Sequence, residues 1–318
     1  MTTISCIYVR LPNWIGDVCM SLPSLRALRD SGVPLVICAR PWARDLLAGV
    51  PKRDFLPMTG KVLRDRAAVA AHRRALGGAT RGLLLPDSLS SAAVFRLAGV
   101  PCAGYRDDGR SPLLRWPVDK PGAGLHAVQS WHYLTRTTLQ RWGLPAGPVE
   151  PGALGLPLTQ AHRDAAGQLL QEQQLAGRPF VLIAPTATGL HKGKVKVWPG
   201  FDALTRALQE RGQTVVMCPP PAEVAEARRN APSATLLPPL GLGAFAALAQ
   251  RAALVVCNDS GVSHVAAAVD ARQLTLFGVT RPGRTGPWSP GAVCLGSETH
   301  WPEPEQVMEK SLELLSGA

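Results

Sequence analysis

Apolar residues recur along the first half of the chain in short runs that alternate with longer stretches of helical periodicity. Ile4 to Val9 predicts a buried strand, and Gly16 to Arg29 predicts a helix with most of its apolar side chains on one face. Further strands are predicted at 35–38, 55–58 and 82–85, and further helices near 41–49, 61–76, 89–98 and 125–142. Such alternation is typical of a doubly wound parallel sheet.

The second half repeats this pattern. Strands are predicted at 180–184, 214–218, 254–257 and 273–277, and helices near 159–175, 199–211, 222–230, 243–251 and 303–315. We therefore expect an α/β protein with two Rossmann-like, doubly wound domains, 1–150 and 151–318. A Pro- and Gly-rich linker at 143–152 joins them. The final helix is also free to pack back on the first domain. In open α/β sheets ligands bind beyond the carboxyl ends of the strands, here expected to face a central cleft.

Composition indicates a soluble, reduced protein. Seven cysteines are scattered and never spaced as C-x-x-C. This argues against a zinc site and indicates reduced thiols in a cytosolic protein. No apolar run approaches the length of about 18 residues that a membrane helix needs. The first residues also do not show the basic region followed by an apolar region that is typical of a signal peptide.

Positive charge is concentrated in the first half. Residues 1–150 hold 20 Lys and Arg against 10 Asp and Glu, whereas residues 151–318 hold 14 against 13. A basic half suits an anionic macromolecule or an anionic membrane surface. An arginine-rich composition with no functional meaning is the alternative.

The turn Asn258-Asp-Ser-Gly261 follows an apolar strand and precedes an Ala-rich helix. Amide groups and the helix dipole at such a turn attract anions, above all phosphate. In the alternative interpretation, Asp259 or Ser260 only caps the helix. The residues of the turn leave both interpretations open.

The motif Asn13-Trp-Ile-Gly-Asp-Val18 places Asp17 just beyond the first strand. Asp17 is either an acid that stabilises a helix N-terminus or a general base that takes a proton from a nucleophilic hydroxyl. Its place at a strand's carboxyl end favours the base.

Two further loops follow strands in the second half. The segment 185–199 contains Lys192, Lys194 and Lys196, which either form a solvated loop or neutralise a leaving diphosphate, with hydroxyl donors from Thr186 and Thr188. The segment 277–287 holds Thr280, Arg281 and Arg284 and is either an ordinary loop or part of the same site. In the first half, the Pro- and Gly-rich stretch 107–124 predicts a long surface loop that carries Arg110 and Arg115.

The sequence lacks the motifs of several classes of enzyme. The sequence has no Walker motif, no G-x-G-x-x-G, no metal-spaced histidines and no G-x-S-x-G elbow. This disfavours a P-loop kinase, a dehydrogenase, a metalloenzyme and an α/β-hydrolase.

Taken together, the motifs resemble those of the ADP-heptose:lipopolysaccharide heptosyltransferases of glycosyltransferase family 9, and the segments 84–92 and 97–105 are similar to the heptosyltransferase II branch. The segments that resemble the family are 11–23, 196–199, 259–264 and 277–280. The resemblance implies a GT-B fold, with the acceptor on the first domain and the nucleotide-sugar on the second. It also implies an inverting transfer of heptose from ADP-heptose to a hydroxyl of the lipopolysaccharide inner core, without a metal or another cofactor.

Residue roles follow from the same resemblance. Asp17 matches the catalytic base and Lys196 the lysine near the donor diphosphate, although Lys192 or Lys194 remains an alternative. The expected donor-binding residues are Thr186, Thr188, Lys192, Lys194, Glu223, Asp259, Ser260, Gly261, His264 and Thr280. The expected acceptor-binding residues are Asn13, Trp14, Gly16 and Arg110. Glu223 follows Cys218-Pro-Pro-Pro-Ala, where many relatives carry a glycine-led turn, so its ribose contact is the weakest of these assignments.

The implied partners are an ADP-sugar donor and an anionic glycolipid acceptor at the cytoplasmic surface of the inner membrane, where a protein without a transmembrane segment associates peripherally. One alternative is a family 9 enzyme that acts on a protein hydroxyl or a small molecule. Another is a nucleotide or nucleic-acid binding module without catalysis, but no nucleic-acid motif is present and aromatic residues make up only 5%.

Overall fold

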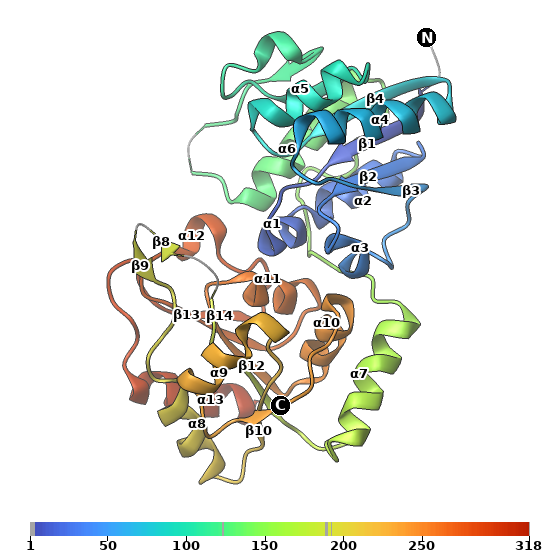
Figure 1. The fold of residues 1–318 in the computed structure, drawn as a ribbon. Helices are drawn as coiled ribbons and strands as arrows, with labels where there is room; N and C mark the ends of the chain where they lie inside the picture. Colours follow the sequence, from blue (N-terminus) through green and yellow to red (C-terminus); the bar gives the residue numbers. More distant parts are fainter. Residues whose placement is uncertain (1–3, 123, 188–189, 192, 318) are drawn as a thin grey trace. The chain divides into compact units, whose positions relative to one another are not determined.

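The computed structural model describes residues 4–122, 124–187, 190–191 and 193–317. Residues 1–153 and 154–318 form two compact units, each with its own sheet and helices (Figure 1). Within the described residues, no helix is both long and apolar enough to cross a bilayer.

The first unit is built on a six-stranded parallel sheet in the order β3-β2-β1-β4-β5-β6. Its strands are β1 (Ile4–Arg10), β2 (Leu35–Ala39), β3 (Asp54–Pro57), β4 (Ala79–Leu84), β5 (Cys102–Tyr105) and β6 (Trp116–Val118). The central strand β1 is buried over most of its length, and Arg10 at its end pairs with Cys38 of β2 and Leu84 of β4. The order reverses between β1 and β4, because the chain first winds toward β3 and then returns to the other side of β1.

Helices connect these strands. They are α1 (Ile15–Met20), α2 (Leu22–Asp30), α3 (Ala43–Leu46), α4 (Val62–Leu76), α5 (Leu89–Leu97), the 3-10 turn η1 (Ser111–Leu113) and α6 (Ala127–Arg141). Val69 of α4 and Phe95 of α5 share one apolar cluster with Tyr8 and Cys38, so α4 and α5 cover one face of the sheet.

The second unit repeats this topology, with the parallel order β11-β10-β7-β12-β13-β14. Its strands are β7 (Val181–Ala184), β10 (Val215–Met217), β11 (Thr235–Leu236), β12 (Leu254–Asn258), β13 (Gln273–Phe277) and β14 (Ala292–Gly296), with a separate antiparallel pair β8 (Leu190–His191) and β9 (Lys194–Val195). Its helices are α7 (Gln160–Glu172), α8 (Phe201–Gln209), η2 (Pro221–Glu223), α9 (Val224–Asn230), α10 (Leu242–Arg251), α11 (Gly261–Ala268), α12 (Pro282–Thr285) and α13 (Pro304–Ser316).

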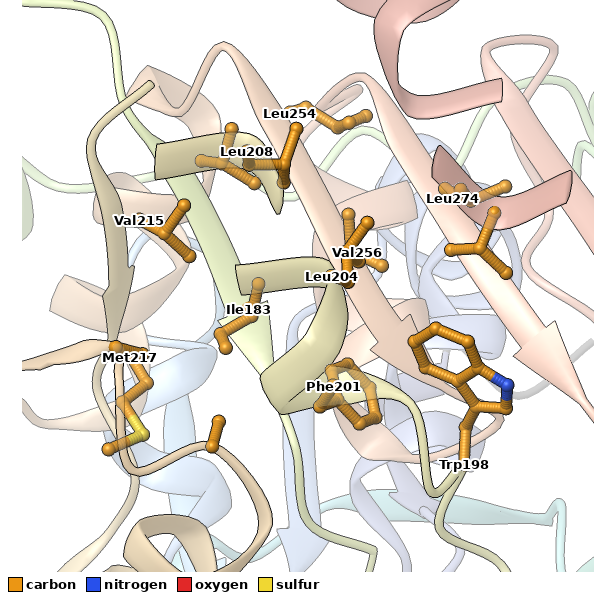
Figure 2. Packing of buried hydrophobic residues seen from close by; sticks show 14 of the residues in the cluster. Ile183, Trp198, Phe201, Leu204, Leu208, Val215, Met217, Leu254, Val256 and Leu274 are labelled. Carbon is orange, nitrogen blue, oxygen red and sulfur yellow. The ribbon is translucent and has the colours of Figure 1, made fainter. Parts of the chain in front are cut away.

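The core of the second unit lies between its sheet and helix α8. Figure 2 shows Ile183, Val256 and Leu274 of three neighbouring strands facing the side chains of α8. Trp198 completes this core: its ring packs edge-on against Phe201 with 5.4 Å between ring centroids. The last helix, α13, buries its own apolar side chains in this same core.

Two predicted elements differ from the observed ones. The single helix predicted at 16–29 is two helices, because Ser21 ends α1 and Pro23 starts α2 in its first turn, where a missing amide donor costs little. The loop predicted at 107–124 contains η1 and the edge strand β6, so that prediction is wrong for its middle part. Pro117 fits there because an edge strand can do without one amide donor.

Candidate active site

Both sheets reverse their strand order beside the central strand, and ligands in open α/β sheets bind beyond the strand ends at such a point. In the first unit the reversal lies between β1 and β4, and in the second between β7 and β12. Asp17 follows β1, Thr186 follows β7, and Asp259 follows β12. These three sequence-predicted residues therefore lie beyond the strands that border the two strand-order reversals.

A buried arginine shapes the loop between β1 and α1. Arg10 is 6% exposed, and its guanidinium donates to the Asn13 side-chain oxygen at 2.6 Å and to the Cys38 carbonyl at 3.5 Å. The loop is thereby held to the ends of β1 and β2. Trp14 precedes α1 and is 72% exposed, and Gly16 is buried.

Asp17 is half-buried in the first turn of α1. A helix N-terminus favours a negative charge and lowers the pKa of a nearby carboxyl group. Here burial has the larger effect and raises the pKa of Asp17 to about 6. Above that pH the carboxylate is ionised, and it is a stronger base than an ordinary aspartate.

Arg110 is buried, contrary to the surface position that the loop prediction gave it. Its side chain is 0% exposed and donates to the Tyr105 carbonyl at 2.9 Å, to the Pro86 carbonyl and to Asp87 at 3.4 Å. Burial lowers the pKa of its guanidinium. Arg110 is therefore placed to hold the segment after β4 in position, and any effect on an acceptor would act through that segment.

The sequence reading missed the polar side chains that Arg110 supports. Asp87 lies three residues after the end of β4, and Lys120 donates to it at 2.7 Å and also to Asp107. Asp87, Asp107 and Lys120 are each partly exposed, with 38%, 43% and 45% of their side chains accessible. The position of Asp87 after a buried strand was the available signal.

In the second unit, Asn258 joins three segments and was also missed as a separate residue. Its side chain is fully buried. Its amide donates to the carbonyls of Ala184 and Thr186, both at 3.3 Å, and its oxygen accepts from the Trp198 amide at 2.9 Å. One side chain thus fixes the end of β7 and the segment that carries Lys196 to the end of β12.

Asp259 lies beside Asn258 and binds two of the predicted residues. Its carboxylate accepts a hydrogen bond from Thr280 at 2.6 Å and lies 3.6 Å from the Lys196 ammonium. Lys196 keeps 21% of its side chain exposed, whereas Asp259 keeps 10%. The carboxylate therefore positions a cation whose outer side is accessible to an anionic ligand.

The turn before α11 is a helix cap. The Ser260 hydroxyl accepts from the Val262 amide at 3.3 Å, and Gly261 begins the helix. His264 lies in the first turn of α11 and is 5% exposed. The cap interpretation of Ser260 is confirmed, and it is compatible with an anion beside the same helix end, where the dipole is positive.

Thr186 and Glu223 form a second polar pair next to β7, where the Thr186 hydroxyl donates to the Glu223 carboxylate. Thr188 and Lys192 lie outside the described residues, and Lys194 is described only as part of the backbone of β9. Of the three candidate lysines, Lys196 is therefore the one whose side chain can be placed. Among the described residues, no three His, Cys, Asp or Glu side chains are grouped as metal ligands.

The chain as a whole is similar to known glycosyltransferases. The profile of glycosyltransferase family 9 (heptosyltransferase) matches residues 69–316. Lipopolysaccharide heptosyltransferase 1 of Pseudomonas aeruginosa is 32% identical over 230 residues, which cover 66% of this chain and 57% of the relative, less than two thirds of its length. Lipopolysaccharide heptosyltransferase 2 of Salmonella typhimurium is 26% identical over 304 residues, covering 87% of this chain and 84% of the relative.

The fold is also similar to that of a solved structure. The solved structure of the Escherichia coli ADP-heptose lipopolysaccharide heptosyltransferase II matches with a TM-score of 0.78 and 23% identity over 98% of each chain. The two Rossmann-like units are therefore those of the GT-B fold.

Proposed function

The chain belongs to glycosyltransferase family 9, the heptosyltransferases, and from this premise we propose that it transfers heptose from ADP-heptose to a hydroxyl group of the lipopolysaccharide inner core. The names of its relatives support this donor and this acceptor, since they are lipopolysaccharide heptosyltransferases and one is an ADP-heptose enzyme. The observation that carries the proposal is the half-buried Asp17, with its raised pKa, at the strand-order reversal of the first unit.

In the proposed reaction, Asp17 takes the proton of the acceptor hydroxyl as its oxygen attacks the anomeric carbon of the heptose. The bond from that carbon to the diphosphate breaks, ADP leaves, and the configuration at the carbon inverts. A base on the acceptor side is what a single displacement of this kind requires. Asn13, Trp14 and Gly16 belong to the same loop as Asp17 and are proposed to contact the acceptor.

Leaving-group stabilisation is proposed for the second unit. Lys196 and the N-terminal end of α11, with Ser260 and Gly261, offer positive charge to the diphosphate. Asp259, which accepts from Thr280, holds Lys196 in place. His264, in the first turn of α11, is proposed to contact the donor as well. Because these groups supply charge on their own, we propose that transfer proceeds without a metal ion or another cofactor.

Glu223 is proposed to bind the ribose of the donor. Its carboxylate already accepts from Thr186 and has further lone pairs for sugar hydroxyls. Thr188, Lys192 and Lys194 remain proposed donor contacts from the same part of the chain.

The test is a transfer assay with purified protein, ADP-heptose and lipopolysaccharide from a heptose-deficient strain. We expect a product heavier by one heptose, formed with inverted anomeric configuration in NMR and at an unchanged rate in EDTA. A thermal-shift comparison of ADP, UDP and GDP checks the donor. A clear preference for UDP, or transfer to a protein hydroxyl but to no core, would contradict the proposal.

A further inference from the structure

Helix α4 of the first unit has an apolar exposed face. Leu63 is 78% exposed, and Ala67, Ala71 and Ala75 follow it at four-residue intervals, all of them exposed. Residues four apart lie on the same side of a helix. Within α4, Asp65 and Val69 are the buried residues. A surface helix normally turns polar residues outward, so this face is suited to contact with something apolar.

Helix α5 extends the same surface. It packs beside α4 in the first unit, where the two helices are drawn in blue and teal (Figure 1). Leu97, at the end of α5, is 59% exposed, and its carbonyl accepts from Arg66 at 3.4 Å. Since Arg66 lies one helical turn from Leu63, the two exposed leucines belong to one surface. Leu89, at the start of α5, is 50% exposed.

Positive charge surrounds these leucines, and the partly exposed acids near them, Asp54 and Asp87, are paired with His72 and Lys120. Six cations belong to this surface, and they are Lys61, Arg64, Arg66, Arg73, Arg74 and Arg96. The acid among them, Asp65, is 4% exposed and accepts from the amides of Thr59 and Gly60, both at 2.8 Å. Its charge is therefore used inside the unit.

Two of the cations are also used internally. Arg66 donates to the carbonyl of Leu97, the last residue of α5, at 3.4 Å, and Arg73 donates to the carbonyl of Ala98, which follows the helix, at 3.1 Å. The other four, which are Lys61, Arg64, Arg74 and Arg96, are exposed, and none has a salt bridge within the described part of the chain. Together with Leu63, Leu89 and Leu97 they make up what we name the α4–α5 surface.

We propose that the α4–α5 surface docks on an anionic lipid bilayer. Exposed arginines and lysines are attracted to acidic headgroups, and leucines that stand among them can enter the boundary between headgroups and acyl chains. Single-stranded nucleic acid would need stacking aromatic side chains, and this surface has aliphatic ones instead. The proposal is independent of the transfer chemistry, although a lipid-linked acceptor would give the docking a purpose.

Sedimentation with vesicles tests the surface. The full-length protein is mixed at 0.15 M NaCl with vesicles of phosphatidylcholine alone or of equal parts phosphatidylcholine and phosphatidylglycerol. We expect the protein to bind the anionic vesicles at least about tenfold more strongly. Leu63→Ser with Leu97→Ser, and separately Arg64→Glu with Arg74→Glu, should each reduce that binding about tenfold.

A matched control variant separates the contribution of the α4–α5 surface to vesicle binding from that of the protein's net charge. Arg178→Glu with Arg228→Glu changes two exposed arginines of the second unit and alters the total charge equally. We expect this variant to bind like the wild type. Equal loss in both charge variants, no preference for anionic vesicles, or tighter binding to duplex DNA than to those vesicles would overturn the proposal.

Transfer to a soluble, delipidated core oligosaccharide provides the second readout. All variants should melt at the wild-type temperature and transfer heptose to this acceptor at the wild-type rate. If no protein, the wild type included, transfers heptose to any core, the proposed function fails while the vesicle result still decides the docking surface.

Discussion

Two opposing influences act on the carboxylate of Asp17. The N-terminus of α1 stabilises its negative charge, and burial destabilises that charge more strongly, as its raised pKa shows. An acid retained only to stabilise the helix would gain nothing from burial. Catalytic side chains commonly lower the stability of the folded protein in this way.

Replacement of Asp17 by Asn therefore has two expected effects. Transfer should fall by about 10²- to 10⁴-fold, because the amide cannot accept the proton. Stability at pH 8 should rise by about 1 to 2 kcal/mol, since the cost of a desolvated charge is removed and only the smaller helix-dipole term is lost. Initial rates and urea unfolding measure the two effects. Lower stability together with full activity would identify Asp17 as a helix-capping acid.

The pH dependence of the same group has a defined sign. As a base, Asp17 must be ionised, so kcat/KM should rise with pH through about 6. Its folded pKa lies above the unfolded value of 3.8, so the native state binds the proton more tightly. The stability contributed by this proton is full below pH 3.8 and is lost as pH rises to about 6. Rate profiles and unfolding curves from pH 5 to 8 check both, with Asp17→Asn as the control that should lack both changes.

Asn258 illustrates how a buried amide can serve a site that it does not itself touch. Asn258→Ala removes three hydrogen bonds and leaves the Trp198 amide without its acceptor, which should cost about 2 to 4 kcal/mol of stability. Because Thr186 and the Lys196 segment lose their common anchor, KM for the donor should rise several-fold while KM for the acceptor stays unchanged. Steady-state kinetics with each substrate varied measure this difference.

Asn230→Ala is the matched control for Asn258. Asn230 is less buried than Asn258. Its side chain donates one hydrogen bond, to the carbonyl of Pro185 at 2.7 Å, just after the end of β7. We expect a smaller loss of stability and little change in either KM. An equal effect of the two substitutions would show that Asn258 has no special positioning role.

At the scale of elements, long and strongly patterned segments could be predicted from the sequence. The strand at 254–257 and the helix after Ser260 are such a case, because a fully apolar run and a capping turn coincide there. Short strands were missed. Cys102–Tyr105, Trp116–Val118 and Ala292–Gly296 are too short or too irregular for a period to be seen, and only pairing with a neighbouring strand makes them part of the sheet.

The same limit applies to the site. Residues at the ends of predicted strands, such as Asp17 and Asp259, could be chosen because the fold class says where function collects. The burial of Arg110 could not, because it depends on Pro86 and Tyr105, which are distant or irregularly placed in sequence. The links that Asn258 makes to Ala184 and Trp198 also span 60 residues or more. Side-chain periodicity has no information about such contacts.

The loop after β13 supplies a prediction about packing. A Cβ atom at Gly278 would lie 2.1 Å from the Trp301 ring, whereas one at Gly283 meets nothing within 4 Å. Gly278→Ala should therefore displace Trp301 or the loop that holds Thr280, with a loss of about 1 to 3 kcal/mol and weaker ADP binding. Gly283→Ala, five residues on, should be neutral. Thermal unfolding with and without ADP compares them, and equal behaviour of the two variants would rule out the steric explanation.

At the scale of the whole molecule, each unit contains a complete sheet, its own apolar cluster and its own strand-order reversal. A ligand bound by one unit stabilises that unit first, because stabilisation acts on the state that binds. If the second unit alone binds the donor nucleotide, ADP should act unequally on the two units.

Hydrogen exchange of the full-length chain tests this inequality. At an ADP concentration of about 100 times Kd, binding contributes about 2.7 kcal/mol, which should slow exchange roughly 100-fold for amides that exchange only when the second unit opens. The largest effects are expected in β7, β12 and α11, because the polar residues at their ends form the proposed diphosphate site. Amides of β1 and β4 should change much less, and UDP at the same concentration should protect neither set. Equal protection of β1 and β12 by ADP would mean either that the first unit also binds nucleotide or that the two units open together, and the predicted unequal action of ADP on the two units would then be wrong.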